Sequence, residues 1–297
     1  MSTIISQVIN GLQTGSVYAL VALGYSMVYG IIMLLNFAHG DVIMVGAYIA
    51  WFTMNKLGLH PAICIFCSII GCTLLGVVIE KIAYKPLRSS PRISLLITAI
   101  GVSYLLENGA QLVVGAGAKM VQSPEGSYII SGPDLVMGGQ HISFTAIITI
   151  VVSAISMIGL TFLVNKTKMG KAMRAVSEDT GSAQLMGIPV NRVISYTFAI
   201  GSALAGIGSV LYCCAYPQAS PTMGAMLGLK AFVAAVLGGI GSIPGAMIGG
   251  YAIGLAEALV SAVGLSVWKD GVVFAILIIV LIVRPTGILG QKITEKV

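Results

Sequence analysis

The feature that most constrains this chain is a succession of apolar runs, each roughly twenty residues long, separated by polar or glycine-rich breaks. A helix of about twenty residues spans roughly 30 Å, which is the thickness of the hydrocarbon core of a bilayer. Of the 297 residues, 57% are hydrophobic and 9% are charged, and a soluble domain of this length cannot bury so much apolar surface. The sequence therefore predicts an integral membrane protein that crosses the bilayer many times.

The apolar runs predict an all-α, polytopic membrane helix bundle of about 8–9 spans, because lipid offers no hydrogen-bond partner to an open backbone. No basic residue precedes Lys56, so the first run is not a secretory signal and should stay as a helix. Glycines recur at helix-face spacing and predict close helix packing at Gly11/Gly15, Gly241/Gly245/Gly249 and Gly250/Gly254. The expected spans cover 4–33, 37–55, 61–80, 93–114, 143–164, 194–215, 222–240, 243–263 and 268–283, within one transmembrane domain over 1–297.

The second run opens with small and polar residues, Asn36-Phe-Ala-His-Gly-Asp41, which need protein or water around them at membrane depth. If the segment crosses the bilayer fully, the N-terminus lies outside, and if it re-enters as a half-helix, the N-terminus lies inside. The polar start favours a broken or re-entrant segment near 36–55.

The positive charges indicate which way the chain crosses the bilayer. Twelve of the 16 basic residues fall in three segments: Lys81, Lys85, Arg88 and Arg92; Lys166, Lys168, Lys171, Arg174 and Arg192; Arg284, Lys292 and Lys296. The loop at about 115–142 carries Lys119 with Glu125 and Asp134. The positive-inside rule therefore places this loop outside, and the loop at about 166–192 and the tail 284–297 in the cytoplasm. The net charge of +6 reports this orientation, and nucleic-acid binding is not expected.

The longest cytoplasmic loop predicts a short amphipathic helix near 171–186, which Gly187 and Pro189 end. Its apolar stripe comprises Ala172, Ala175, Val176, Ala183 and Met186. Such a helix can lie on lipid headgroups, link two spans, or dock into a groove on a cytoplasmic partner.

Four motifs in this order resemble the permeases of the branched-chain amino-acid ABC importer family. They are Leu35-Asn-Phe-Ala-His-Gly-Asp41, then Met169-Gly-Lys-Ala-Met-Arg-Ala-Val176 with Ala183-Gln-Leu-Met-Gly-Ile188, then Leu237-Gly-Gly-Ile-Gly-Ser-Ile-Pro-Gly-Ala-Met-Ile-Gly-Gly250, and Arg284-Pro-Thr-Gly-Ile-Leu-Gly290. The resemblance covers essentially the whole chain. Two departures are Lys171, where the family pattern has Arg, and Gly181, which weakens a helix interior by about 1 kcal/mol.

The resemblance implies a permease subunit of an ATP-driven importer in the bacterial cytoplasmic (inner) membrane, which performs no covalent chemistry and binds no cofactor. It also implies the partners: a second related permease subunit, two cytoplasmic ATPase subunits that bind ATP and Mg²⁺, and an extracytoplasmic substrate-binding protein. Closure of the ATPases would move the 166–192 loop and rock the helices about a midplane path. The residues implied in this coupling are Gly170, Lys171, Arg174, Ala175, Glu178, Ala183, Leu185 and Gly187.

Ionisable and polar groups at membrane depth cost several kcal/mol, so each is a candidate for the substrate path. They are Asn36, His39, Asp41, Glu107, Lys230 and Glu257. Structural roles are the alternative: Lys230 can snorkel to an interface, Glu107 and Glu257 can form interhelical hydrogen bonds, and Asp41 can cap a half-helix.

The sequence lacks the motifs of an ATPase and of a metal site. The sequence holds no phosphate-binding G-x-x-x-x-G-K-[ST] loop, so any ATPase is a separate chain. No metal site is expected, because Cys64-x-x-Cys67 has no second pair or nearby His. Two rivals remain: a permease of the same fold for urea or short amides, and a stand-alone ion-coupled carrier or channel that uses Glu107 and Glu257.

Overall fold

The computed structural model describes residues 2–32, 36–88, 90–122, 129–130, 132–137 and 140–290. The helices are α1 (Ser2–Ile32), α2 (His39–Trp51), α3 (Pro61–Ile79), α4 (Arg92–Val114), α5 (Phe144–Lys166), α6 (Lys168–Glu178), α7 (Thr180–Leu185), α8 (Val190–Ala215), α9 (Met223–Gly238), α10 (Ile243–Ala262) and α11 (Lys269–Val283). Two π-helical segments follow α2 and α3, namely η1 (Phe52–Lys56) and η2 (Glu80–Tyr84), and two 3-10 turns are η3 (Lys85–Leu87) and η4 (Ser266–Trp268).

The apolar runs form helices where the sequence predicts them, with ends that agree within four residues for every expected span outside 37–55. Within the described residues, seven helices are long and apolar enough to cross a membrane, and α9 is a shorter apolar helix. The prediction of a polytopic helical bundle is therefore confirmed.

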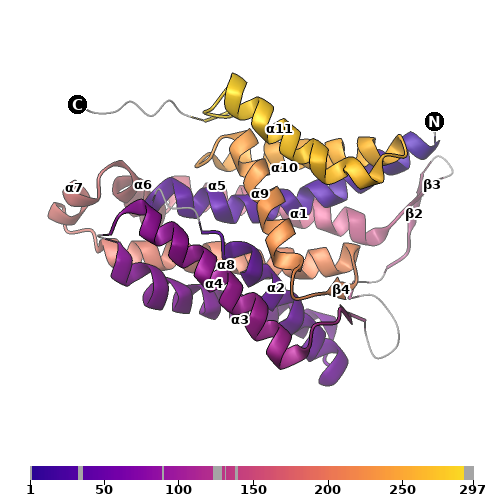
Figure 1. Ribbon diagram of the computed structural model, residues 1–297, viewed down its shortest axis with the longest axis horizontal. Coiled ribbons are helices and arrows are strands. Elements are labelled where there is room, and N and C mark those ends of the chain that lie inside the picture. The colour runs from indigo at the N-terminus through magenta and orange to yellow at the C-terminus, as the bar shows by residue number, and fades with distance from the viewer. Residues whose placement is uncertain are drawn as a thin grey trace.

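Short strands gather at one end of the bundle, called here the strand end. β1 (Lys119–Met120) pairs with β4 (Gln218–Ala219), and β2 (Leu135–Met137) pairs with β3 (Gln140–Ile142), both antiparallel. The other end carries α6 and α7 and is called the α6–α7 end (Figure 1). Within the expected outer loop, residues 123–128, which include Glu125, lie outside the described residues, as do Lys292 and Lys296 of the tail.

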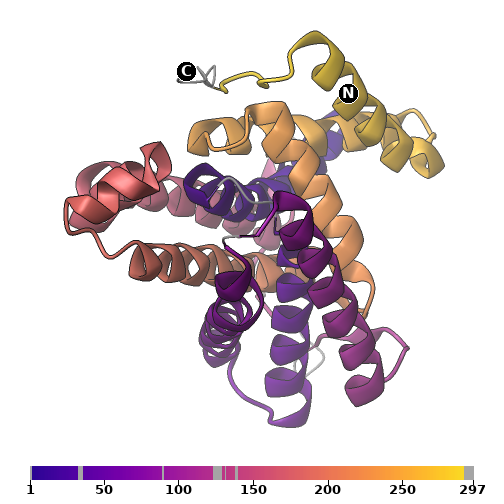
Figure 2. The same cartoon turned by 60° about the vertical axis from the view of Figure 1, so that its left-hand side comes forward.

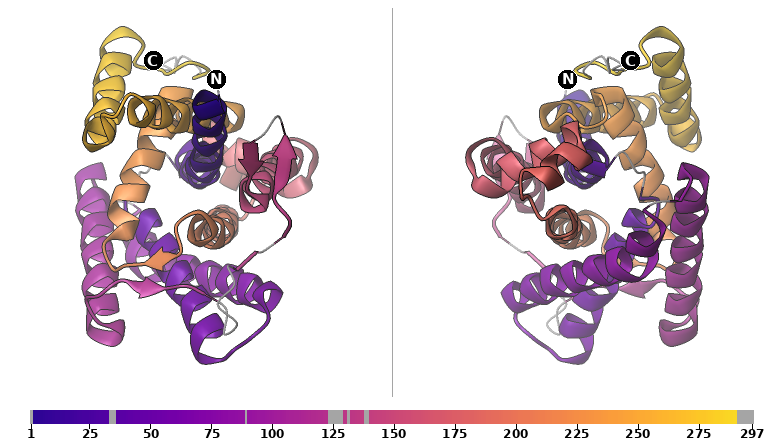
Figure 3. Two further views of the ribbon diagram at one scale, coloured as in Figure 1. Left: turned by 90° about the vertical axis from the view of Figure 1, so that its right-hand side faces the viewer. Right: turned by 90° about the vertical axis from the view of Figure 1, so that its left-hand side faces the viewer.

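Helix α1 lies at the centre of the bundle, between α5, α8, α9 and α10, and α4 and α11 lie along one edge (Figure 3). Close packing over glycine holds α1 against α10: a Cβ on Gly15 would stand 2.9 Å from the Cα of Tyr251, and one on Gly254 would overlap Gly15. The predicted glycine faces are thus confirmed for this pair. Gly241 is an exception, because it lies in the α9–α10 turn with a φ of 90°.

The α1–α2 segment is broken and does not re-enter. Helix α1 starts at the strand end, where Thr14 and Tyr216 hydroxyl oxygens are 3.4 Å apart, and runs to the α6–α7 end. The chain turns at residues 36–38, and α2 then begins inside the protein, where His39 packs against Gly24. Its π-helical extension reaches the strand end, where the Asn55 side chain donates to the Met120 carbonyl at 3.2 Å. This geometry places the N-terminus at the strand end.

The prediction of one helix over 171–186 is wrong. Helix α6 begins earlier, at Lys168, and ends at Glu178, and α7 follows after Asp179, whose backbone is extended. The Asp179 carboxylate accepts from the Gly181 amide at 2.9 Å, so a new N-cap forms where a continuous helix was expected. The turn redirects the apolar stripe, and Met186 is 83% exposed as a result.

Candidate functional site

Helix α6 is fixed to the bundle along its apolar face. Gly170, Met173 and Val176 are buried, and a Cβ at Gly170 would collide with the carbonyl oxygens of Leu163 and Val164. Only glycine permits this close approach to the end of α5. Gly170 therefore positions α6, while its neighbour Lys171 is exposed.

Arg174 also ties α6 to α5. Its guanidinium donates to the Val164 carbonyl at 2.5 Å and to the Asn165 side-chain oxygen at 3.2 Å. Carbonyls of the last turn of a helix lack partners within the helix and carry partial negative charge, which a cation neutralises. A movement of α6 would therefore pull directly on the end of α5.

The tip of the segment, α7 and the turn after it, is exposed beyond the ends of α5 and α8 (Figure 2). Ala183 is buried, but Leu185 is 90% exposed and Met186 is 83% exposed. Gly187 adopts a φ of 81°, which ends α7 as the sequence predicts. Ala175 is half-buried and Glu178 is exposed. The α6–α7 end thus presents two large apolar side chains beside charged ones.

A cavity of about 870 Å³ opens beside α6. It lies between the ends of α1, α5 and α9, the α9–α10 turn, and residues 285–290, and both Arg174 and Glu178 line it. Two of the motifs meet on its wall, because the amides of Ile288 and Leu289 donate to the carbonyls of Leu237 and Gly238, each at 2.9 Å.

Three polar residues of the stretch 36–41, called here the α1–α2 break, lie together inside the bundle. Asn36, His39 and Asp41 are 4%, 1% and 0% exposed. The His39 ring packs edge-on against Tyr25, and its Nε2 has no hydrogen-bond partner among the described residues. Asp41 does not cap α2, since its carboxylate instead accepts from the Ser103 hydroxyl on α4 at 2.5 Å.

Lys230 and Glu257 meet in a buried ion pair of 2.7 Å. Lys230 also pairs with Asp270 on α11 at 2.6 Å, and the Tyr18 hydroxyl on α1 donates to Glu257 at 2.9 Å. Lys230 therefore does not snorkel to an interface, because its side chain is 9% exposed and held by two carboxylates. Asp270 was not among the predicted site residues, because it lies near the start of the expected span 268–283.

Glu107 lies on α4, one turn after Ser103, and is half-buried. Its neighbours on the outward side of α4 include Tyr104, which is 62% exposed, and Asn108, which is also exposed. The structure therefore places Glu107 on the surface of the bundle, one helical turn from the residue that contacts Asp41.

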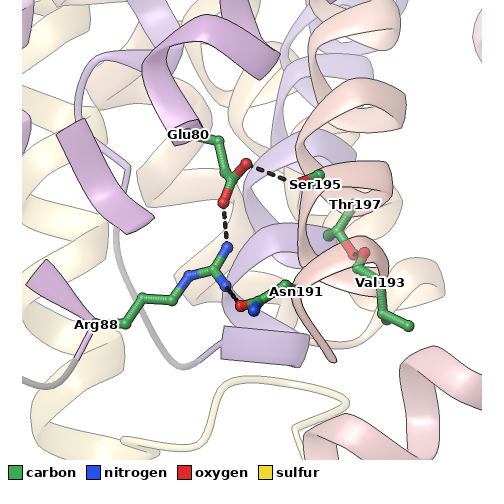
Figure 4. A network of polar contacts seen from close by, with 6 residues as sticks. All are labelled: Glu80, Arg88, Asn191, Val193, Ser195 and Thr197. Carbon is green, nitrogen blue, oxygen red and sulfur yellow. Dashed lines mark hydrogen bonds and ion pairs between the residues drawn. The ribbon is translucent and has the colours of Figure 1, made fainter. Parts of the chain in front are cut away.

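A second buried ion pair, absent from the predicted site residues, joins Glu80 in η2 to Arg88 (Figure 4). The Glu80 side chain is fully buried, and Ser195 on α8 donates to it at 2.7 Å. A carboxylate followed by an arginine eight residues later was visible in the sequence, but Glu80 stood at the end of an expected span and was passed over. Within the described residues, no group of three His, Cys, Asp or Glu side chains could hold a metal ion.

Known proteins resemble the chain over nearly its full length. A family model described as the permease component of branched-chain amino acid transport systems matches residues 7–281. The high-affinity branched-chain amino acid transport system permease protein BraD of Pseudomonas aeruginosa is 44% identical over 99% of this chain and 98% of its own length. LivH of Escherichia coli K12, whose name describes the same kind of permease, is 43% identical over 99% and 97%. Among solved structures, PsaBC from Streptococcus pneumoniae shares the fold, with a TM-score of 0.50, 16% identity and coverage of 93% of this chain and 91% of that chain.

Proposed function

Because this chain belongs to the family of permease components of branched-chain amino acid transport systems, we propose that it imports branched-chain or other apolar amino acids across a bacterial inner membrane. It is the membrane-spanning subunit, and ATP hydrolysis takes place in two separate ATPase subunits. The observation that carries the separate ATPase is the α6–α7 end, where Leu185 and Met186 are exposed and Lys171 and Glu178 on α6 are exposed as well. Exposed apolar side chains rimmed by charge are typical of protein interaction sites.

The α6–α7 segment docks onto an ATPase subunit in this proposal. Leu185 and Met186 enter a groove on the ATPase, and Lys171 and Glu178 contact its rim. Gly170, Arg174, Ala175 and Ala183 fix the segment to the bundle, and Gly187 ends α7 at the correct place. Movement of the docked segment is then transmitted to α5 by the Arg174 hydrogen bonds. It is transmitted to α8 by the backbone, because α8 follows α7 in the sequence.

The charge distribution supports a cytoplasmic α6–α7 end. The basic residues Lys85, Arg88, Lys171, Arg192 and Arg284 lie at or near this end, and Arg88 donates to Asn191 in the first turn of α8. With this orientation the described end of the C-terminal segment is cytoplasmic, and the N-terminus is outside. The strand end then receives the substrate-binding protein.

A second, related permease subunit covers α4. Tyr104 and Asn108 are exposed on a helix at membrane depth, with Glu107 half-buried beside them, and lipid is a poor solvent for such side chains. A partner subunit and a water-filled path between the two subunits provide the polar surroundings. Glu107 lines this path, and Asn36, His39 and Asp41 shape it from behind α4 through the Ser103 contact.

The buried ion-pair cluster of Lys230 on α9, Glu257 on α10 and Asp270 on α11 lies beside a smaller cavity of about 330 Å³ at the strand end. Glu257, Thr14 and Tyr216 line that cavity, and Lys230 is paired with Glu257 behind it. The cluster would hold α11 in place next to the outer mouth of the path and supply a polar wall there.

The test is co-purification of the chain with the products of neighbouring genes in mild detergent, scored for an ATPase. We expect a stoichiometric ATPase that is lost from Leu185→Glu and weakened in Lys171→Glu. Val267→Glu is the matched control, because Val267 is 94% exposed at the strand end. No ATPase with the unaltered chain, together with solute flux by the chain alone, would establish a stand-alone carrier instead.

The substrate is tested in the same complex, reconstituted in liposomes with its binding protein. Uptake of labelled leucine should be ATP-dependent and should fall when unlabelled isoleucine or valine is added. Uptake that responds to urea or a short amide, and not to these amino acids, would reassign the substrate and leave the importer in place.

A further inference from the structure

The first three turns of α8 present one face to the end of α3. Asn191, Ser195 and Phe198 follow each other at helix-face spacing, and each contacts a residue of the segment from Glu80 to Arg88. Helix α8 follows the α6–α7 segment, residues 168–185, after a connection of Met186, Gly187, Ile188 and Pro189. A movement of α7 therefore reaches this face of α8 directly along the chain, as a movement of α6 reaches the end of α5.

The polar part of this contact, called here the polar clasp, comprises Glu80, Arg88, Asn191 and Ser195 (Figure 4). Arg88 uses both terminal nitrogens: one pairs with Glu80, and the other donates to the Asn191 side-chain oxygen at 2.5 Å. The remaining oxygen of Glu80 accepts from Ser195. One guanidinium fork and one carboxylate thus join α8 to the α3–α4 connection at two successive turns.

The contact continues inward through Tyr84, one turn after Glu80. The Tyr84 ring packs against Phe198 with ring centroids 5.4 Å apart. Its hydroxyl donates to the Asn36 side-chain oxygen at 2.8 Å, in the α1–α2 break. Both side chains are buried, so the chain of contacts from α8 to the break does not pass through solvent.

We propose that the polar clasp, with Tyr84, is a positioning relay that transmits movement of the ATPase-docked α6–α7 segment to the α1–α2 break. This inference rests on the proposed docking role. When α8 tilts, Asn191 and Ser195 carry Arg88 and Glu80 with them, and Tyr84 displaces Asn36 and the turn ahead of His39. The break is the irregular backbone at membrane depth, where a small displacement opens or closes the path.

Two features fit a mechanical role for the clasp. An ion pair with a fully buried carboxylate resists separation, because the unpaired charge has no solvent to stabilise it. The π-helical form of η2 is rare and often occurs at functional sites, where it changes which side chains of a helix share a face. Glu80 and Tyr84 can therefore both contact α8, while Arg88 forms its ion pair with Glu80.

The decisive variant is Asn191→Ala/Ser195→Ala, which removes both hydrogen bonds between α8 and the polar clasp and leaves the Glu80–Arg88 pair intact, so no buried charge is left without a partner. The matched control is Thr197→Val, because among the described residues the Thr197 hydroxyl donates to the Val193 carbonyl within α8 and to no part of the clasp (Figure 4). The measurement is the number of amino-acid molecules transported per ATP hydrolysed by the complete importer in liposomes. We expect a fall of about fivefold or more in the double variant, the lower end of typical coupling effects, and no change in the control.

Arg88→Lys gives an independent check, because lysine keeps the charge that pairs with Glu80 but loses the planar fork that also holds Asn191. Its transport per ATP should fall as in Asn191→Ala, and the combination should fall no further, since both changes break the same contact. Additive losses in the combined variant would mean that the fork is not the connection.

The outcomes separate the relay from the docking proposal. An unaltered chain that binds no ATPase contradicts docking. A double variant that retains its ATPase and its transport per ATP overturns the relay. A variant that loses thermal stability or yield, while the assembled fraction keeps its transport per ATP, also overturns the relay, because a purely structural contact behaves in this way.

Discussion

Lys230 neutralises two carboxylates at once, Glu257 on α10 and Asp270 on α11, in a part of the bundle where its own side chain is 9% exposed. Removal of one partner from a buried ion pair is costly because the other charge is left without compensation. The two sides of this cluster are not equivalent. Loss of the lysine leaves the buried Glu257 without a cation, since only Asp270 is partly exposed to solvent, at 41%, whereas loss of Glu257 still leaves Lys230 its bond to Asp270.

Lys230→Met should therefore destabilise the protein more than Glu257→Gln does. We expect a loss of about 3–5 kcal/mol for the lysine variant, the range for a broken buried pair. Thermal unfolding of the detergent-solubilised protein shows which of the two variants is less stable. The double variant Lys230→Met/Glu257→Met should recover part of the loss, since it removes the stranded buried acid, and equal stability of the two single variants would contradict the assignment.

At the scale of the element, helix contacts in this protein depend on the absence of side chains. Gly254 of α10 lies against Gly15 of α1 so closely that a methyl group at Gly254 would overlap the α1 backbone. Gly159 of α5 is different, because a Cβ there would meet nothing within 4 Å. The same substitution therefore tests packing at one position and intrinsic helix preference at the other.

Gly254→Ala should lower the free energy of unfolding by about 1–3 kcal/mol, the cost of overpacking a closely packed contact. Gly159→Ala should be neutral or raise it by up to about 1 kcal/mol, because alanine is the better helix former. Thermal unfolding midpoints of the two variants give the comparison. A Gly254→Ala protein as stable as Gly159→Ala would show that α1 and α10 can separate without loss.

The sequence predicts helix positions well because the length of an apolar run sets the length of a span. It does not predict which faces meet, because α9 and α10 each carry a single charged residue and no continuous polar face, and so the Lys230–Glu257 pair could not be foreseen. The end of α6 at Asp179 had a sequence indication, because Asp is a preferred N-cap residue and Gly181 follows two residues later, but the apolar positions on both sides of Asp179 fit one continuous helical stripe. Glu80 was missed because its partner Arg88 approaches only through a π-helical turn.

For the whole molecule, orientation follows from the two ends. The strand end should face the outside and the α6–α7 end the cytoplasm, if the basic residues mark the inner face. Two exposed positions, Gly117 and Gln184, report on opposite ends of the bundle. The native cysteines lie in the spans, where four are buried and Cys67 is half-buried, so the unaltered protein serves as the blank.

Gly117→Cys should react with a membrane-impermeant maleimide in intact cells, and Gln184→Cys should react only after permeabilisation. Mass shift of the purified protein on a gel measures both. Reaction of Gln184→Cys in intact cells, with protection of Gly117→Cys, would invert the orientation and remove the basis for docking an ATPase at α6–α7.

The central position of α1 has a consequence for synthesis. Among the described helices α1 is synthesised first, yet the surfaces that cover it belong to α8 and α10, the latter completed about 230 residues later. At typical translation rates that interval is roughly 10 to 50 s. During this time α1, with its serines and tyrosines uncovered, has lipid or an insertion factor as its neighbour. The order of synthesis thus makes the most central helix the one that waits longest for its neighbours.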